Sequence, residues 1–319
     1  MHAAVVRSFD RPPSYEFVPD PVATTDDEMV VEILAAGLHP RVRSGANGTH
    51  YSSSGRLPLV PGVDAVGRTP AGELVYFVAS DDVAGTMAER ALVDRRRSVV
   101  LAADADPVAV AGGMNPAMSS WVALRRRVDF RPGQSVLVLG ATGNAGQMAV
   151  QIAKHLGADR VVGAGRDAER LGTLVGLGAD TAVSLSGARG EVDARLAAAC
   201  TDIDVVIDYL WGEPAEHAMR SLVGHRADRA HQLDWVQVGA VAGPDITLSS
   251  EILRGANLRV LGSGQGSVST AGIVSELSAI ATEITNGAIR VDALPAQLAD
   301  VETAWIDGAP PGQRLVLVP

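Results

Sequence analysis

The sequence predicts an α/β protein built from a doubly wound, parallel six-stranded sheet and a second, β-rich module. After Arg131, short and wholly apolar strands alternate with amphipathic helical stretches, which is the pattern of βαβ units in a parallel sheet. Before that point, short runs rich in β-branched residues lie between turn residues, as in a β-rich module. The chain has 319 residues, which is enough for two domains.

The β-rich module comes first along the chain. Its strands are expected at residues 2–6, 15–18, 29–35, 73–78 and 91–93. Turn residues such as Pro12-Pro13 and Asn47-Gly48 separate these runs. The module is therefore expected to be rich in short strands and loops.

The parallel sheet is expected to contain six strands, at residues 135–139, 160–164, 181–185, 203–208, 235–239 and 258–262. The helices between them are expected at residues 144–156, 168–177, 190–199, 213–222 and 249–254. A further helix, 271–285, precedes a last strand, 314–318. This strand has no seventh place in a six-stranded sheet, so we expect it to return to the first module. The predicted domains are 1–116 together with 264–319, and 117–263.

Composition excludes several classes of function. The net charge of −10 disfavours a nucleic-acid partner, and no apolar run approaches the length of a membrane span. A single cysteine, Cys200, excludes disulfide frameworks, cysteine-rich zinc sites and paired-thiol redox chemistry. The first residues contain no apolar core of signal-peptide length, so we expect a cytoplasmic protein. Its expected partner is a small-molecule substrate.

A glycine-rich loop joins the first strand of the predicted parallel sheet to the following helix. Glycines at this turn let the backbone fold tightly and approach a pyrophosphate, while the start of the helix offers free N–H groups and a positive dipole end. The position of the loop between a strand and a helix strengthens an otherwise weak spacing motif. The residues expected to bind a dinucleotide here are Gly140, Thr142, Gly143, Asn144, Ala145 and Gly146.

The end of the second strand predicts which dinucleotide is bound. An NAD site usually has a carboxylate there, whereas an NADP site has a small residue and a nearby arginine. The strand ends at Gly165, and Arg166 follows directly. A guanidinium group suits a 2′-phosphate, so NADPH is the expected cofactor. The alternative is that Arg166 is merely solvated and Asp167 serves as an NAD-type acid.

Several segments together resemble the medium-chain dehydrogenases/reductases, and within them the zinc-independent quinone oxidoreductases that include zeta-crystallin. The similarity follows nearly the whole chain in order, and its most specific part is the run from Pro132 to Gly157. The other matching segments are Ala36-Gly37-Leu38-His39-Pro40, Pro61-Gly62-Val63-Asp64, Met118-Ser119-Ser120-Trp121, Asp204-Val205-Val206-Ile207-Asp208 and Gly312-Gln313-Arg314-Leu315-Val316-Leu317.

The resemblance implies a GroES-like catalytic domain made from both chain ends and a Rossmann domain between them. It also implies an active site in the cleft and a homodimer formed by edge pairing of Rossmann sheets through residues 258–262. The zinc-dependent branch of the family holds its catalytic metal with two cysteines and a histidine. The corresponding positions here carry His39, Val63 and Asn115, and valine cannot bind zinc. We therefore expect no metal.

The resemblance also places candidate residues for substrate and cofactor. His39 stands where the branch commonly has asparagine; it is a candidate proton or hydrogen-bond donor, with a packing histidine as the alternative. Tyr51 lies on a loop that lines the substrate cleft in the family, with surface packing as the alternative. Ser119 matches a threonine that approaches the cofactor, with a helix N-cap as the alternative. Loops after the later strands are also expected at the cofactor, with residues Tyr209, Gly239, Ala240, Val241 and Ser263.

The sequence thus predicts an NADPH-dependent, zinc-independent reductase that transfers hydride to a quinone or an activated alkene. Short-chain reductases are excluded, because they need a lysine four residues after a tyrosine and the one lysine, Lys154, has no such tyrosine. Two alternatives stay open. One is a specialised biosynthetic carbonyl or C=N reductase of the same family, and the other is a non-catalytic NADPH-binding sensor.

Overall fold

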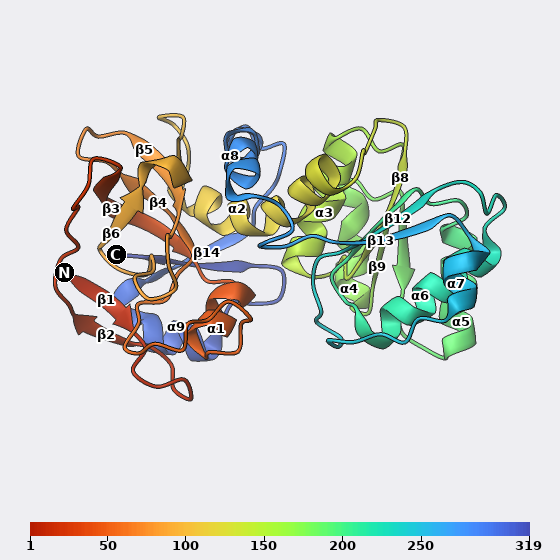
Figure 1. Ribbon diagram of the computed structural model, residues 1–319, viewed down its shortest axis with the longest axis horizontal. Helices are drawn as coiled ribbons and strands as arrows, with labels where there is room; N and C mark the ends of the chain where they lie inside the picture. The colour runs from red at the N-terminus through yellow and green to blue at the C-terminus, as the bar shows by residue number, and fades with distance from the viewer. The chain divides into compact units, whose positions relative to one another are not determined.

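Six strands between residues 135 and 262 form one parallel sheet in the order β10-β9-β8-β11-β12-β13. Figure 1 labels four of them, β8, β9, β12 and β13. The structure, a computed structural model, describes residues 1–319. The strands are β8 (Ser135–Leu139), β9 (Arg160–Gly165), β10 (Thr181–Ser184), β11 (Val205–Asp208), β12 (Leu233–Gln237) and β13 (Leu258–Gly262). Along the chain, β9 and β10 are added on one side of β8, and β11, β12 and β13 are then added on its other side. Dinucleotide-binding folds have this strand order, so the predicted fold class is confirmed.

Helices follow the strands of this sheet as βαβ units require. They are α3 (Asn144–His155), α4 (Ala168–Thr173), α5 (Arg189–Ala199), α6 (Gly212–His225) and α7 (Ser250–Gly255). The predicted helix 168–177 is in fact split, because α4 tightens into a 3₁₀ turn over Leu174–Leu177. Apolar residues of β8, β9, β11 and β12 are almost wholly buried; Leu137, Val206 and Trp235 are each 0% exposed. The sheet is thus apolar on both faces, as a sheet covered by helices must be.

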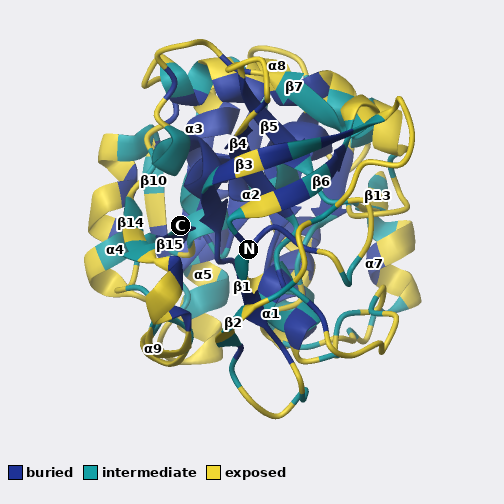
Figure 2. Cartoon of the chain, turned by 90° about the vertical axis from the view of Figure 1, so that its left-hand side faces the viewer, coloured by how far each residue is buried: buried dark blue, intermediate teal, exposed yellow.

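Strands from both ends of the chain form a seven-stranded sheet with path β14-β15-β3-β4-β5-β7, and β6 pairs with β3. Its members are β3 (Glu28–Gly37), β4 (Asp64–Arg68), β5 (Leu74–Val78), β6 (Arg90–Asp94), β7 (Ser98–Val100), β14 (Ala293–Gln297) and β15 (Arg314–Val318). A separate ribbon pairs β1 (His2–Val5) with β2 (Ser14–Phe17). Figure 2 shows how far β3, β4 and β5 are buried. The last strand, β15, pairs with β3, so the predicted return of the chain end is confirmed.

Several elements of this part were not predicted. They are the strands β4, β7 and β14 and the helices α1 (Pro40–Ala46), α2 (Pro107–Val122) and α9 (Val301–Asp307); helix α8 (Thr270–Thr285) lies where it was expected. Pro295 concealed β14, because proline is disfavoured in strands. It is tolerated here since β14 lies at an edge of its sheet. Strand β4 has glycine and aspartate among its five residues and so lacks a strong strand pattern.

The chain divides into two compact units. The β-rich unit contains Met1–Asn115 and Val274–Pro319, and the parallel-sheet unit contains Pro116–Ile273. The C-terminal boundary of the parallel-sheet unit lies after Ile273, ten residues beyond the predicted boundary after residue 263. One reason is that the guanidinium group of Arg127 donates to the carbonyl oxygens of Gly262 (2.7 Å) and Ser267 (3.3 Å), which ties the segment after β13 to the parallel-sheet unit. No helix of either unit is long and apolar enough to span a membrane.

Candidate functional site

The glycine loop makes a tight turn between β8 and α3. Gly140 has a φ of +86°, and its N–H and that of Ala141 both donate to the carbonyl of Ala164 at 2.9 Å. A Cβ at Gly146 would lie 2.2 Å from the carbonyl oxygen of Gly140, so no side chain fits there. Gly143 is the extended N-cap residue of α3 and has no side chain to cap it. The first N–H groups of α3 therefore have no capping side chain, and this is the arrangement that binds an anion.

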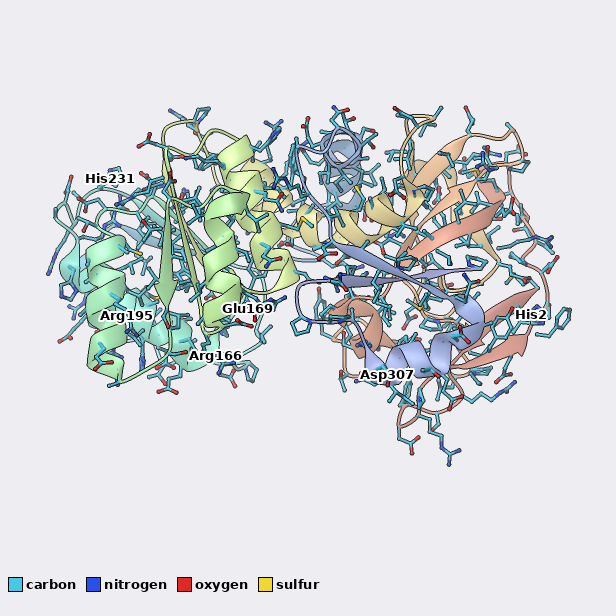
Figure 3. The ribbon with its side chains drawn as sticks, turned by 180° about the vertical axis from the view of Figure 1, so that it is seen from behind. His2, Arg166, Glu169, Arg195, His231 and Asp307 are labelled. Carbon is cyan, nitrogen blue, oxygen red and sulfur yellow. The ribbon has the colours of Figure 1, made fainter.

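A side chain at the end of β9 would collide with Thr142. A Cβ at Gly165 would lie 2.6 Å from Cγ2 and 2.7 Å from Oγ1 of Thr142. Arg166 follows on the surface, where Figure 3 labels it. Asp167 acts as the N-cap of α4, since its Oδ1 accepts the N–H of Arg170 at 3.1 Å. The carboxylate of Asp167 is thus engaged in its own helix.

Two other predicted cofactor residues, far apart in sequence, meet directly. The hydroxyl groups of Ser119 and Tyr209 are 2.7 Å apart, and Ser119 Oγ also donates to the carbonyl of Pro116 at 2.7 Å. Ser119 lies inside α2, so the N-cap alternative is wrong. Burial raises the pKa of Tyr209 to about 12. Tyr209 therefore stays protonated and keeps its hydrogen bond over the physiological range.

The loop after β11 also holds the loop after β12. The carbonyl of Tyr209 accepts the N–H of Val241 at 3.3 Å, and the position of a Cβ at Gly239 is only 3.0 Å from the same oxygen. Ala240 lies between them, and Ser263 starts the segment after β13, with its N–H donating to Gln237 at 2.8 Å. These predicted residues all follow the carboxyl ends of their strands, where doubly wound folds bind ligands.

In the β-rich unit, His39 belongs to a buried polar network that sequence reasoning missed. Its ring is 2% exposed, and Nε2 lies 3.2 Å from Oδ1 of Asp64, which is 1% exposed. The hydroxyl of Tyr76 donates to Oδ2 of Asp64 at 2.6 Å; burial and this carboxylate raise the pKa of Tyr76 well above its usual value. Burial lowers the pKa of Arg314 to about 10, and the attraction of Asp64 opposes that shift. The one signal in the sequence was the position of Asp64 in the Pro61-to-Asp64 motif.

Nδ1 of His39 and Nε of Arg314 have no hydrogen-bond partner in this network. Because the Nε2 of His39 faces a carboxylate, the ring proton belongs on Nε2 and leaves Nδ1 as a buried acceptor. An unsatisfied buried polar atom is uncommon and is often linked to function. The structure thus makes His39 a hydrogen-bonded, packed histidine that still has one unused nitrogen.

Tyr51 lies on an exposed loop. Its side chain is 74% exposed, and its ring contacts that of His50 in a tilted arrangement, with centroids 4.2 Å apart and an interplanar angle of 33°. Arg41 donates to the hydroxyl of Ser52 at 3.0 Å, which attaches the loop to α1. Burial and the nearby Arg41 lower the pKa of His50 to about 4, so this histidine is neutral at pH 7. The side chain of Tyr51 is therefore supported by an uncharged ring.

Comparisons with known proteins agree with this geometry. Residues 145–279 match the family model described as zinc-binding dehydrogenase. A probable NADPH-dependent quinone reductase of Emericella nidulans is 31% identical over an alignment of 360 positions, which covers 100% of both chains.

The chain belongs to the medium-chain dehydrogenases/reductases. Within this superfamily it falls in the quinone oxidoreductase branch. The quinone oxidoreductase of Thermus thermophilus, whose structure is described with and without NADPH, is 26% identical, with a TM-score of 0.82 and coverage of 100% of both chains. The NADPH-dependent alkenal/one oxidoreductase of Arabidopsis thaliana is 28% identical over 50% of this chain and 45% of that protein.

The positions that correspond to the zinc ligands of the zinc-dependent branch do not carry a set of zinc-binding side chains in this chain. Of the three corresponding positions, His39 directs Nε2 to Asp64, Val63 is apolar and Asn115 is a poor zinc ligand. No group of three or more His, Cys, Asp or Glu side chains could hold a metal ion. Burial raises the pKa of Cys200 to about 12, which keeps this thiol protonated and a poor ligand.

Proposed function

We propose that the protein is an NADPH-dependent, zinc-independent oxidoreductase that reduces quinones or activated alkenes such as α,β-unsaturated carbonyl compounds. The observation that carries this proposal is the glycine loop: Gly146 packs against the carbonyl of Gly140 and leaves the start of α3 open to a pyrophosphate. The names of the relatives, a quinone reductase and an alkenal/one oxidoreductase, support the substrate class.

The proposed cofactor site has three parts. Backbone N–H groups of Asn144 and Ala145 bind the pyrophosphate, at a turn made possible by Gly140 and Gly146. Gly143 closes this turn, since its N–H donates to the carbonyl of Gly140 at 3.0 Å. Arg166 binds the 2′-phosphate, and Gly165 with Thr142 forms the adjoining wall. The nicotinamide is flanked by the residues that follow the later strands and by Ser119; these are Tyr209, Gly239, Ala240, Val241 and Ser263. NADPH supplies a hydride when it is bound there.

The chain's own contribution to the reaction is to bind the substrate oxygen as negative charge develops on it. Hydrogen-bond donors aimed at that oxygen lower the barrier to hydride transfer. The candidates are the hydroxyl of Tyr51 and the imidazole of His39, whose unused Nδ1 donates only when both ring nitrogens carry a proton. Because the zinc-ligand positions lack a ligand set, we assign the charge stabilisation to these donors rather than to a metal.

We also propose that the protein is a cytoplasmic homodimer. Strand β13 ends the parallel sheet, so one edge of its backbone has no strand partner within the chain. Its residues Arg259 and Val260 are exposed. An exposed strand edge of this kind pairs readily with a second copy. Light scattering of the purified protein tests the dimer, and a monomer at micromolar concentration would contradict it.

Consumption of NADPH with a panel of substrates tests the activity. The panel contains quinones, α,β-unsaturated ketones and aldehydes, and saturated ketones, each measured with NADPH and with NADH. We expect turnover of the first two groups with NADPH. Tight NADPH binding without turnover across the panel would instead indicate a sensor.

The Arg166→Ala variant tests cofactor choice. Loss of charge-assisted hydrogen bonds to a phosphate should raise the KM for NADPH about tenfold to a hundredfold and leave that for NADH unchanged. Arg131→Ala is a matched control, since Arg131 is exposed and lies before β8, at the opposite end of the strand from the glycine loop. Equal effects on both cofactors, or a wild-type preference for NADH, would contradict the role of Arg166.

A further inference from the structure

We propose that Asp208 is a positioning residue of the cofactor site. Its buried carboxylate holds the loop 209–212 in a strained backbone conformation and thereby places Tyr209 against Ser119. The inference rests on the proposed NADPH site, because the loop follows the carboxyl end of β11 and contacts the glycine loop. It assigns a role to a residue that touches neither substrate nor cofactor.

The carboxylate of Asp208 accepts three hydrogen bonds from uncharged donors. Oδ1 accepts the backbone N–H groups of Leu210 (2.8 Å) and Trp211 (3.0 Å), and Oδ2 accepts the indole N–H of Trp235 (3.0 Å). Asp208 is 0% exposed. Burial raises the pKa of Asp208, and these hydrogen bonds oppose the shift. Burying a carboxylate among neutral partners costs desolvation free energy. We therefore look for the contribution of Asp208 in the backbone segment that its hydrogen bonds fix.

What it holds is an unfavourable backbone conformation. Trp211 has φ of 51° and ψ of −163°, a region that is populated almost only by glycine. The next residue, Gly212, has φ of +60°. The N–H of Trp211 is one of the two that Oδ1 accepts, so the carboxylate captures the strained residue directly. Backbone strain of this kind persists only where the surroundings determine it, and it is concentrated at functional sites.

The loop 209–212 contacts both neighbouring loops, the glycine loop and the loop after β12. The position of a Cβ at Gly140 lies 3.1 Å from Leu210 Cδ2 and 3.3 Å from Tyr209 Cβ, so the loop lies against the first glycine of the glycine loop. On the other side, the carbonyl of Leu210 accepts the N–H of Ala242 at 2.8 Å. The backbone carbonyl of Asp208 itself accepts the N–H of Gly239 at 3.1 Å. A shift of the loop would therefore change the proposed pyrophosphate and nicotinamide contacts together.

The first test compares Asp208→Asn with Asp204→Asn. The carboxylate of Asp204 also accepts hydrogen bonds, from the N–H and hydroxyl of Ser135, and it faces Nε2 of His231 at 2.6 Å. Asp204 precedes β11, at the opposite end of that strand from Asp208. An asparagine at 208 can still accept from the two backbone groups, but its NH₂ then faces the indole N–H of Trp235. We expect Asp208→Asn to raise the Kd of NADPH about threefold to tenfold, whereas Asp204→Asn leaves it unchanged.

A second variant separates positioning from simple loss of stability. Trp235→Phe removes one donor and keeps an aromatic ring in the core, and the double variant with Asp208→Asn should lose less affinity than the product of the single effects. Unchanged NADPH affinity in folded Asp208→Asn would overturn the inference. So would an equal loss of affinity in Asp204→Asn.

A readout that needs no cofactor keeps the inference testable by itself. If Asp208 holds the loop, Asp208→Asn should let Tyr209 ionise at a lower pH, which the ultraviolet absorbance of tyrosinate reports. Folded Asp208→Asn with an unchanged tyrosine titration would contradict the positioning role. Failure of the wild-type protein to bind NADPH would count against the proposed function alone, because the tyrosine titration would still report on the loop.

Discussion

Replacing Gly165 by alanine should destabilise the protein unless Thr142 is shortened at the same time. The new methyl carbon would lie 2.6 Å from Cγ2, 2.7 Å from Oγ1 and 3.2 Å from Cβ of Thr142. Gly165 is buried and lies in strand β9, without a positive φ, so its backbone conformation itself accepts alanine. Any destabilisation therefore comes from this one side-chain contact.

The magnitude follows from the overlap. Forcing a methyl group into a filled space costs about 1–3 kcal/mol. Thr142→Ala alone should cost about 1 kcal/mol or less, since the residue is half-buried. The double variant removes both γ atoms and leaves only the contact at 3.2 Å, so it should recover most of the loss. We expect a coupling free energy of about 1–2 kcal/mol from urea unfolding of the four proteins.

The same contact should control an attempt to change the cofactor. An acidic residue at 165 is what an NAD site requires, but its Cβ meets Thr142 as the alanine does. Gly165→Asp alone should therefore lose NADPH without gaining NADH, whereas Thr142→Ala with Gly165→Asp should gain NADH. Additive effects on the free energy of unfolding would refute the steric reasoning, as would efficient use of NADH by the single Asp variant.

Three further predictions follow from other contacts. Gly146→Ala should weaken NADPH binding more than tenfold in a titration, because its Cβ would lie 2.2 Å from the carbonyl oxygen of Gly140; Gly172→Ala, with nothing within 4 Å, should not. Trp211→Gly should be more stable to urea than Trp211→Ala by about 1 kcal/mol, because glycine relieves the strained conformation; the reverse order would contradict the strain. The pKa of Tyr209 is about 12 in the folded protein, against the ordinary value of 10 that applies to the unfolded chain. Between pH 10 and 12 the unfolded chain releases this proton and the folded protein keeps it, so the free energy of unfolding falls as pH rises. Tyr209→Phe should reduce that slope by up to about 1.4 kcal/mol per pH unit, and an unchanged slope would count against the burial of Tyr209.

The parallel-sheet unit was predictable because its signals are local. Each strand is a short apolar run, each helix has its own periodicity, and the glycine loop is contiguous in sequence. Even the return of β15 followed from counting strands. Where local signals were weak, prediction failed: β4 and β14 contain residues that strands disfavour, and pairing with neighbouring strands decides their conformation.

The polar contacts of the site were decided by tertiary structure. His39 and Tyr51 could be proposed from type and position, but the partner of His39 is Asp64. Asp64 in turn interacts with Tyr76 and Arg314, which are far apart along the chain. Likewise, no pattern pairs Ser119 with Tyr209 across 90 residues. Buried side chains must find partners wherever the fold brings donors and acceptors within 3 Å or so, and sequence spacing does not report that distance.

The sequence alone therefore determined the positions of the six parallel strands, the dinucleotide loop and the choice of NADPH as expected cofactor, because these depend on residue types at neighbouring positions. Only the tertiary structure decided that Gly165 must be glycine because of Thr142, and that Asp208 holds a strained loop through Trp235. Asp208 and Trp235 lie on adjacent strands, and Thr142 directly follows the strand that pairs with the strand of Gly165. Both contacts join segments that are separated in sequence, so their energies exist only once the sheet has formed.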